Sequence, residues 1–381
     1  TLLLFFIGVK LSGSYWIGLL FGLFYALNVP AALFEVTILA ETLSTFLTVI
    51  LLLVELFALR MVYRRESALR LLPLFALTGV LCGILALSKH KFMLFWVAPT
   101  GIFALLILSQ YALRRLVSAP AMKRRLLGLL AIAVVPAGIA IGWSVVNWNN
   151  FGWFTFSPIS GINLSNVAGG FIEYASDPRC NDFVNAYLQY RQAEIERTGT
   201  HAMTIYRTMQ VQIDPENLQQ RVEYQRLAYD CSLSAILARP DLYFKTALAS
   251  SDLFWDPAIY SRVPLQGPPK WLADQAKTAL LVLRRLFEFA TVLWLALPLA
   301  IFRARFPNRE AVVLRWWEIG LLLASIWYVY LVSSGFEFGE NRRYKSEIEA
   351  FIPVVIFLTF QLYAALLSRV LGRRKRAPQR N

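Results

Sequence analysis

Long apolar runs are the feature that most constrains how this chain can fold. A helix needs about 20 mostly apolar residues to cross the roughly 30 Å of hydrocarbon in a bilayer. Only 16% of the 381 residues are charged, against about 25% in a typical soluble domain. We therefore predict an all-α polytopic membrane protein with about eight transmembrane helices and an N-terminal stub. The expected spans are residues 13–29, 38–60, 71–88, 92–113, 126–146, 286–302, 316–333 and 350–370, and the stub is residues 1–9.

The distribution of basic residues predicts the orientation of these spans. The formal net charge of +14 would favour nucleic-acid binding in a soluble protein. Here Lys and Arg gather in alternate connections between the apolar runs, at 60–70, 114–125, 303–315 and 373–380. Cytoplasmic loops of membrane proteins carry such an excess. We expect these segments in the cytoplasm, the protein in the inner (plasma) membrane, and no nucleic-acid partner.

A polar insert divides the chain into parts. Residues 147–277 are expected to form a mixed, mainly helical extracytoplasmic domain between an N-terminal transmembrane bundle, 1–146, and C-terminal transmembrane helices, 278–370. A basic cytoplasmic tail, 371–381, follows. The chain opens at Thr1 inside an apolar run, without Met and without the basic region of a signal peptide. We therefore expect it to begin partway through a longer protein.

Two of the three cysteines fall in the polar insert. Cys180 and Cys231 would lie in an oxidising compartment on this topology. A disulfide between them is one hypothesis and two free thiols is the other, because spacing alone does not show that they approach. Cys82 lies in a span and is expected to be a packing residue.

A segment of mixed charge, residues 335–349, separates the last two apolar runs. A bilayer accepts such groups only where they meet water, each other or a charged ligand. Its basic side chains suit a lipid phosphate, and the acidic ones share the same surface. The charged residues are Glu337, Glu340, Arg342, Arg343, Lys345, Glu347 and Glu349.

Two further groups are expected on this outer side. Glu41 stands with Glu35 at the entrance of a span, either as a first-turn anion stabilised by the helix dipole or as a carboxylate that orients a substrate hydroxyl or helps hold a metal. Lys89 and Lys91 flank His90 in a tight connection. Their ammonium groups either snorkel to the lipid headgroups or bind an anionic lipid phosphate.

Other polar features have structural and functional interpretations. The aromatic and Asn-rich segment 147–164 fits an interfacial aromatic belt or a surface that stacks on a sugar. Glu55 and Glu318 lie towards the cytoplasmic ends of their spans and are interpreted as structural, with Glu55 paired to Arg60 or another basic residue. The sequence has no nucleotide-binding loop and no metal motif of Cys and His spacing, so no cofactor is assigned, and a divalent metal is left open.

These segments, in this order, resemble the GT-C superfamily of polytopic glycosyltransferases, in particular the bacterial branch related to protein O-mannosyltransferases and lipid A aminoarabinose transferase. The order and sidedness of the motifs, more than any single motif, carry the resemblance. The matching segments are 40–47, with Glu-Thr-Leu at a span entrance; 85–91, the short basic connection; 147–164, the exit into the outer domain; and 339–344 followed by Pro353, the late Glu/Arg-Tyr/Pro motif.

The resemblance implies transfer of a sugar from a polyprenyl-phosphate donor to a glycan, lipid or protein acceptor on the outer leaflet or in the periplasm. It implies a general-base Asp in a first external loop, which would precede Thr1, and a supporting catalytic role for Glu41. Residues expected to bind the substrate are Lys89, Lys91, Glu340, Arg342, Arg343 and Tyr344. The alternatives are a lipid-linked glycan transporter or flippase, and a non-catalytic membrane fragment.

Overall fold

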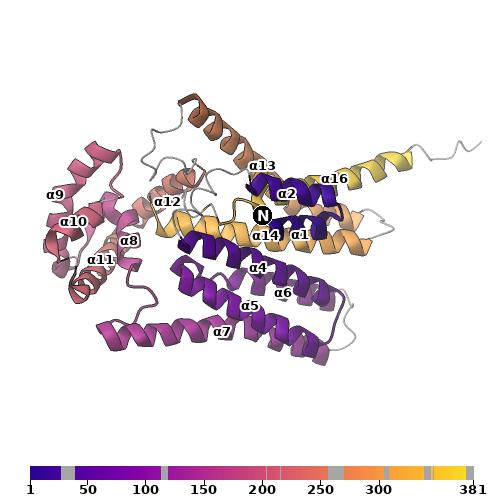
Figure 1. Ribbon diagram of the computed structural model, residues 1–381, viewed down its shortest axis with the longest axis horizontal. Helices are drawn as coiled ribbons and strands as arrows, with labels where there is room; N and C mark the ends of the chain where they lie inside the picture. The colour runs from indigo at the N-terminus through magenta and orange to yellow at the C-terminus, as the bar shows by residue number, and fades with distance from the viewer. Residues whose placement is uncertain are drawn as a thin grey trace, which may run out of the picture.

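The computed structural model is helical throughout the part of the chain that it describes. That part comprises residues 1–26, 39–112, 119–202, 204–214, 216–255, 270–303, 309–338, 345 and 347–374. The helices form an elongated molecule in which one end of a membrane-type bundle carries a smaller helical domain (Figure 1). We call this end of the bundle the domain end and the other the opposite end.

Six of the described helices are long and apolar enough to cross a membrane. Their apolar faces need no soluble-type core, because lipid accepts the exposed surface. This agrees with a helical membrane protein, whereas the described residues do not reach the expected count of about eight spans. The six are α4 (Leu39–Tyr63), α5 (Ala68–Ser88), α6 (Val97–Ala112) extended by the 3₁₀ turn η1 (His90–Phe92), α7 (Ala119–Phe151), α14 (Arg309–Phe336) and α16 (Phe351–Arg374).

The first two helices are shorter than a span. Helix α1 (Leu2–Ser12) has 11 residues and so reaches about 17 Å, roughly half the hydrocarbon thickness. Gly13, with φ 75°, ends it, and α2 (Tyr15–Ala26) returns beside it. A Cβ added to Gly8 would lie 2.8 Å from the Cα of Gly18, so small residues permit this contact. The expected stub is therefore one arm of a helical pair.

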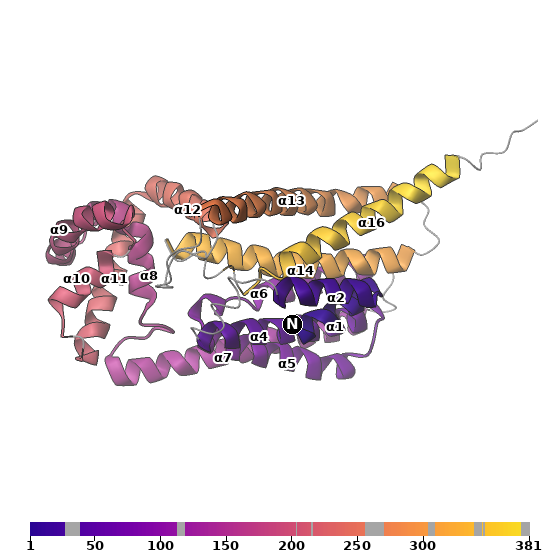
Figure 2. The same cartoon turned by 45° about the horizontal axis from the view of Figure 1, so that its top comes forward.

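Small residues also let α5 and α7 approach closely. A Cβ on Gly79 would lie 2.6 Å from the carbonyl oxygen of Ala131, and one on Gly83 would overlap the side chain of Ile139. Close backbone approach of this kind is typical of helices that pack in a membrane, where the hydrophobic effect does not drive helices together. Helices α4 to α7 consequently form one layer of the bundle. Helices α13 (Lys270–Arg303), α14 and α16 form the other layer (Figure 2).

The helices at the domain end have a core of their own. Residues such as Phe183, Tyr187 and Ile205 are almost fully buried in it. Helix α8 packs on α11 at Gly161, where any Cβ would overlap the carbonyl of Gln225. The five helices are α8 (Ser160–Ala168), α9 (Asn181–Thr198), α10 (Thr204–Gln212), α11 (Leu218–Ala238) and α12 (Pro240–Phe254).

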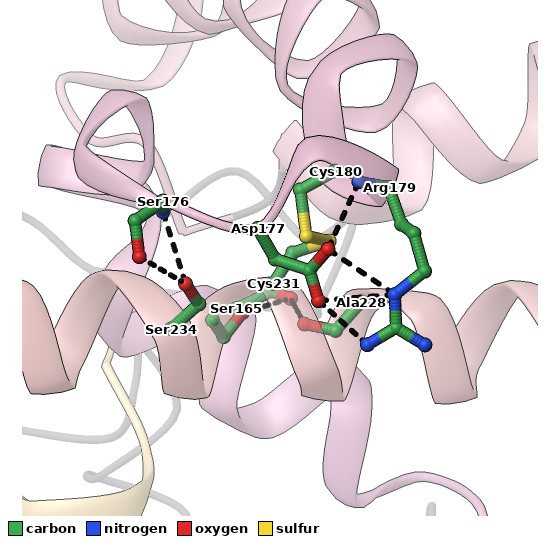
Figure 3. The surroundings of a disulfide bond; sticks show 9 residues. Ser165, Ser176, Asp177, Arg179, Cys180, Ala228, Cys231 and Ser234 are labelled. Carbon is green, nitrogen blue, oxygen red and sulfur yellow. Dashed lines mark hydrogen bonds and ion pairs between the residues drawn. A yellow bond between two sulfur atoms is a disulfide. The ribbon is translucent and has the colours of Figure 1, made fainter.

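Cys180 and Cys231 form a disulfide, which confirms that hypothesis (Figure 3). The bond joins the 3₁₀ turn η3 (Pro178–Cys180) to α11, and both sulfur-bearing residues are buried. Beside it, Asp177 accepts a hydrogen bond from the backbone N–H of Arg179. The two side chains also form an ion pair, with Nη2 of Arg179 2.6 Å from Oδ2 of Asp177. Cys82 is free and buried, as expected.

At the opposite end, Glu318 receives two guanidinium groups. Arg60 Nε lies 2.6 Å from its Oε1, and Arg315 Nη1 lies 3.0 Å from its Oε2. The expected pairing of Glu55 with Arg60 is wrong. Glu55 and Arg60 are five residues apart on α4, so their side chains point in directions that differ by roughly 140°. Glu55 is fully buried and has no hydrogen-bond partner in the described part of the chain.

Candidate functional site

The connection between α5 and α6 brings two lysine side chains to one point. Helix α5 ends as the backbone N–H of Lys89 donates to Leu85, and Lys89 then becomes extended, with φ −150°. The turn η1 follows at once and carries Lys91. The helices α8 to α12 at the domain end are called the polar domain below. A connection this tight leaves both ammonium groups beneath that domain, instead of spreading them along the membrane surface.

Both lysines bind the carboxylate of Glu347. Lys89 Nζ lies 2.6 Å from Oε1 and Lys91 Nζ lies 2.5 Å from Oε2. The hydroxyl of Ser44, from α4, also donates to Oε1 at 2.8 Å. The side chain of Glu347 is fully buried, and those of Lys89 and Lys91 are only 10% and 5% exposed. We call Ser44, Lys89, Lys91 and Glu347 the lysine–glutamate cluster.

Burial decides between two interpretations of the lysines. A snorkelling ammonium group reaches water, whereas these two are enclosed and paired, so the snorkelling interpretation is wrong. A buried ion is expensive to remove from water and is tolerated only with good geometry and further hydrogen bonds. Glu347 meets that condition at Oε1, which has both Lys89 and a hydrogen bond from Ser44, whereas Oε2 has the Lys91 ion pair without hydrogen-bond geometry. The two cations concentrate positive charge at one point of the bundle.

Tyr328 fixes the lysine turn against α14. Its hydroxyl donates to the carbonyl oxygen of Lys91 at 2.7 Å and accepts from the backbone N–H of Leu94 at 3.2 Å. The ring packs edge-on against Phe95. The position of Lys91 is therefore set from its main chain as well as from its ammonium group.

The chain before α16 supplies the carboxylate from a compact turn. The backbone N–H groups of Ile348 and Glu349 both donate to the carbonyl oxygen of Lys345, at 3.0 and 2.9 Å. Lys345 is itself buried, with Nζ 3.8 Å from the carboxylate of Glu349. The turn presents Glu347 to the lysines and keeps a second pair of opposite charges next to it.

Helix α8 connects the polar domain to the membrane helices through two asparagines. The side-chain amide of Asn163 donates to Nε2 of His90, between the two lysines. One turn later the amide of Asn166 donates to Oε1 of Glu337 at 2.8 Å. Asn166 is 1% exposed and Glu337 is 2% exposed. Because residues three apart share a helix face, one short helix contacts both the lysine turn and the end of α14.

His201 extends this contact into the polar domain. Its Nε2–H donates to the backbone carbonyl of Asn166 at 3.0 Å, and its ring stacks on Phe338 with centroids 4.9 Å apart. Burial lowers the pKa of His201 below its ordinary value; Arg191 lowers it further, while the bond to Asn166 opposes the shift. A Cβ on Gly170 would lie 3.2 Å from the ring, so this glycine makes room for the neutral imidazole.

The aromatic segment after α7 has a structural role at its start. Asn147 is 4% exposed and its amide donates to the carbonyl oxygens of Thr155 and Phe156, at 2.8 and 3.3 Å. These two bonds stabilise the turn by which the chain reverses after α7. The rings of Trp148 and Phe154 are more than half exposed, which fits the aromatic belt at the membrane boundary.

The structure brings together only part of the predicted site. Lys89 and Lys91 meet in the cluster. Glu41 lies in the first turn of α4, three residues before Ser44, and its side chain is outside the described residues. The same holds for the whole of four predicted substrate-binding residues, Glu340, Arg342, Arg343 and Tyr344.

The sequence interpretation missed the residue at the centre of the cluster. Glu347 was one charge among seven in the mixed-charge segment, Asn163 was one residue of the segment 147–164, and Ser44 and Asn166 were not singled out. A signal for Glu347 existed: it lies three residues before an apolar run, on the side where two lysines were expected. The asparagines gave no such signal, because their partners lie far away in the sequence.

The cluster can stabilise negative charge at a fixed point, because its two ammonium groups are already desolvated and held in place. Among the described residues, no three His, Cys, Asp or Glu side chains gather as a metal site would require. Comparison with protein-family models, curated proteins and solved structures finds no match to this chain.

Proposed function

We propose that this chain acts in a membrane glycosyltransferase related to the GT-C superfamily, which moves a sugar from a polyprenyl-phosphate donor to a glycan, lipid or protein acceptor. The lysine–glutamate cluster is the observation that carries the proposal. It holds two buried ammonium groups, of Lys89 and Lys91, at the end of the membrane helices and beneath the polar domain. A lipid-borne phosphate would present its charge at this depth.

The proposed chemistry requires cations at the leaving phosphate. When the bond between sugar and phosphate breaks, negative charge develops on the phosphate oxygens, and fixed ammonium groups lower the energy of that transition state. Lys89 and Lys91 take this role, and Glu347 keeps them in position. Arg342, Arg343, Glu340 and Tyr344 are proposed to complete the donor site.

The acceptor hydroxyl must lose a proton to a carboxylate or another base. Glu41 is proposed to support this step, one helical turn before Ser44 on α4. The polar domain, connected through Asn163 and Asn166, would cover the donor and limit access of water. No metal is assigned to the reaction.

We further propose a multi-pass protein of the plasma membrane with about eight spans, an extracytoplasmic polar domain and a cytoplasmic C-terminus. The disulfide between Cys180 and Cys231 supports this orientation, because disulfides persist in oxidising compartments. The basic residues at the opposite end, including the Arg60 and Arg315 pair on Glu318, agree with the positive-inside bias.

A lipid-linked glycan transporter is the second candidate, and Glu55 favours it. A carboxyl group inside a membrane helix is costly and is a functional suspect by default. Glu55 is fully buried and lacks a hydrogen-bond partner among the residues described, as a proton-carrying group of a transporter would be. A transporter would move the donor lipid between leaflets and release no sugar.

The deciding experiment is a sugar-transfer assay on the full-length protein that contains this chain, reconstituted in proteoliposomes with a panel of polyprenyl-phosphate sugars. We expect transfer of one sugar and loss of at least about 100-fold in rate for Lys91→Gln, as is typical when one charge-stabilising group is removed. Lys245→Gln, an exposed lysine of α12, is the matched control and should transfer at the wild-type rate.

Two outcomes would contradict the proposal. Wild-type transfer by a folded Lys91→Gln variant would remove the cluster from the reaction, and wild-type transfer by Arg343→Ala would remove the late motif. Movement of the donor lipid across the bilayer without release of sugar, abolished by Glu55→Gln, would favour the transporter.

A further inference from the structure

The opposite end of the bundle carries a cavity that the proposed glycosyltransferase does not use. Its volume is about 350 Å³, and it opens between the end of α4, the end of α6 and the start of α14. Its lining residues are Tyr63, Arg64, Arg65, Gln110 and Glu310. Because three membrane-type helices end here, the cavity lies at the depth of lipid headgroups.

Gln110 gives the cavity an unsatisfied buried acceptor. Its amide nitrogen donates to the carbonyl oxygens of Val62 and Tyr63, at 3.3 and 3.2 Å, and so completes the end of α4. These two bonds fix which way the amide points. Its Oε1 is consequently turned from those carbonyls, and it is buried without a hydrogen-bond partner in the described residues. A buried acceptor of this kind calls for a donor.

Arg65 supplies a cation at an energetic cost. It is the one non-glycine residue with positive φ among those described, at 64°, where a glycine would normally follow the end of a helix. Neither Arg65 nor its neighbour Arg64 forms an ion pair within the described chain, and both are exposed. The nearby carboxylate of Glu66 is bound by Arg70 at 2.9 Å.

Two further contacts hold this turn rigid. Arg125, from α7, is 6% exposed and donates to the carbonyl oxygen of Glu66 at 2.8 Å. The hydroxyl of Tyr63 donates to the backbone carbonyl of Glu310 at 2.7 Å. The turn that carries the two guanidinium groups is therefore fastened to α7 and, through the wall of the cavity, to α14.

We propose that this cavity binds a phosphoethanolamine group, as the headgroup of a membrane phospholipid. Arg64 and Arg65 bind the phosphate, for which guanidinium groups are well suited. The ammonium group donates to Oε1 of Gln110 and to the carboxylate of Glu310. One ligand thereby supplies an anion for the two guanidinium groups, a donor for the buried Oε1 of Gln110 and a counter-ion for the exposed Glu310, and basic pockets between membrane helices bind anionic lipid headgroups.

The test measures thermal stabilisation of the delipidated, detergent-purified chain by added lipids. Phosphatidylethanolamine should give a saturable rise in melting temperature. Phosphatidylcholine has the same net charge but no N–H donor, and it should give little rise. Soluble O-phosphoethanolamine distinguishes the source: saturation only with the lipid supports a membrane ligand, and saturation at the same concentration with the soluble compound supports a soluble one.

Three variants make the result specific to the cavity. Arg65→Gly should weaken binding by about tenfold or more while leaving the unliganded melting temperature equal or higher, because glycine relieves the positive φ. Glu310→Gln should reduce the preference over phosphatidylcholine. Arg124→Gln, an exposed residue of α7 outside the cavity lining, should bind as the wild type does.

Two results would overturn the proposal. One is equal stabilisation by phosphatidylethanolamine and phosphatidylcholine in the wild type. The other is unchanged affinity for phosphoethanolamine in Arg65→Gly. Neither depends on sugar transfer, since none of these residues belongs to the lysine–glutamate cluster.

Discussion

The ammonium group of Lys91 lies 2.5 Å from the carboxylate of Glu347, although the first follows α5 and the second precedes α16. The same carboxylate holds Lys89. This relationship closes the domain end of the bundle, because it joins the early helices to the last one through buried charge. Its energetics differ from those of a surface ion pair, because water does not solvate either charge when the other is removed.

Glu347→Gln should therefore be strongly destabilising. It leaves two buried ammonium groups without their carboxylate, and breaking a buried ion pair from one side costs about 3–5 kcal/mol. We expect a large fall in melting temperature in detergent. The triple variant Lys89→Met, Lys91→Met, Glu347→Leu should recover most of the loss, because an apolar replacement avoids the desolvation cost. A melting temperature of Glu347→Gln equal to that of the wild type would show that the cluster is solvated.

Asn166→Leu should loosen the polar domain from the bundle. It removes the donor to Oε1 of Glu337, and losing one hydrogen bond to a buried charged group costs about 1–3 kcal/mol. Hydrogen exchange should increase in α8 and at the end of α14, while α5 and α7 stay protected. Ser234→Ala, which removes only a partly exposed contact to Ser176, is the matched control. Unchanged exchange in Asn166→Leu would mean that other contacts dock the domain.

The burial of His201 should make the stability of the polar domain depend on pH. Its folded-state pKa is lowered, first by burial, so the unfolded chain binds a proton more readily than the folded one. The stabilisation is complete above the ordinary pKa of about 6.5 and is lost as the pH falls towards the folded-state pKa. Melting temperatures measured across this window should rise with pH. His201→Gln should flatten the rise, and an equal slope in both proteins would assign it to other groups.

How far the sequence predicts this fold is seen by comparing α4 with α1. The apolar run at 38–60 is long and uninterrupted, so it predicts a spanning helix, and the structure has α4 there. The sequence also separates a stub at 1–9 from a run at 13–29, and the structure has α1 and α2 there, paired with each other. Hydropathy measures transfer to lipid and carries no information about which apolar helices pair.

The site divides in the same way. Lys89 and Lys91 were predictable because charge beside apolar runs is rare and must be explained. Their partner could be narrowed only to the mixed-charge segment, because which of its carboxylates meets the lysines depends on the packing of α5, α14 and α16. For Glu55 the sequence spacing suggested Arg60 as a nearby partner. The two side chains lie on different faces of α4, and Glu55 has no hydrogen-bond partner in the described residues.

Cys231→Ser should destabilise the polar domain in proportion to the loop that the disulfide closes. The sequence separation is 51 residues, for which the chain-entropy model gives about 4 kcal/mol of stabilisation. Both cysteines are buried in the domain core, so the variant adds a buried hydroxyl to the lost cross-link. Protease resistance of the domain should fall, and reduction of the wild type should reproduce most of the effect. Cys82→Ala, which removes a free buried thiol from α5, should leave the domain as resistant as before, with or without reductant. Equal resistance of wild type and Cys231→Ser would show that the helical core alone determines the stability of the domain.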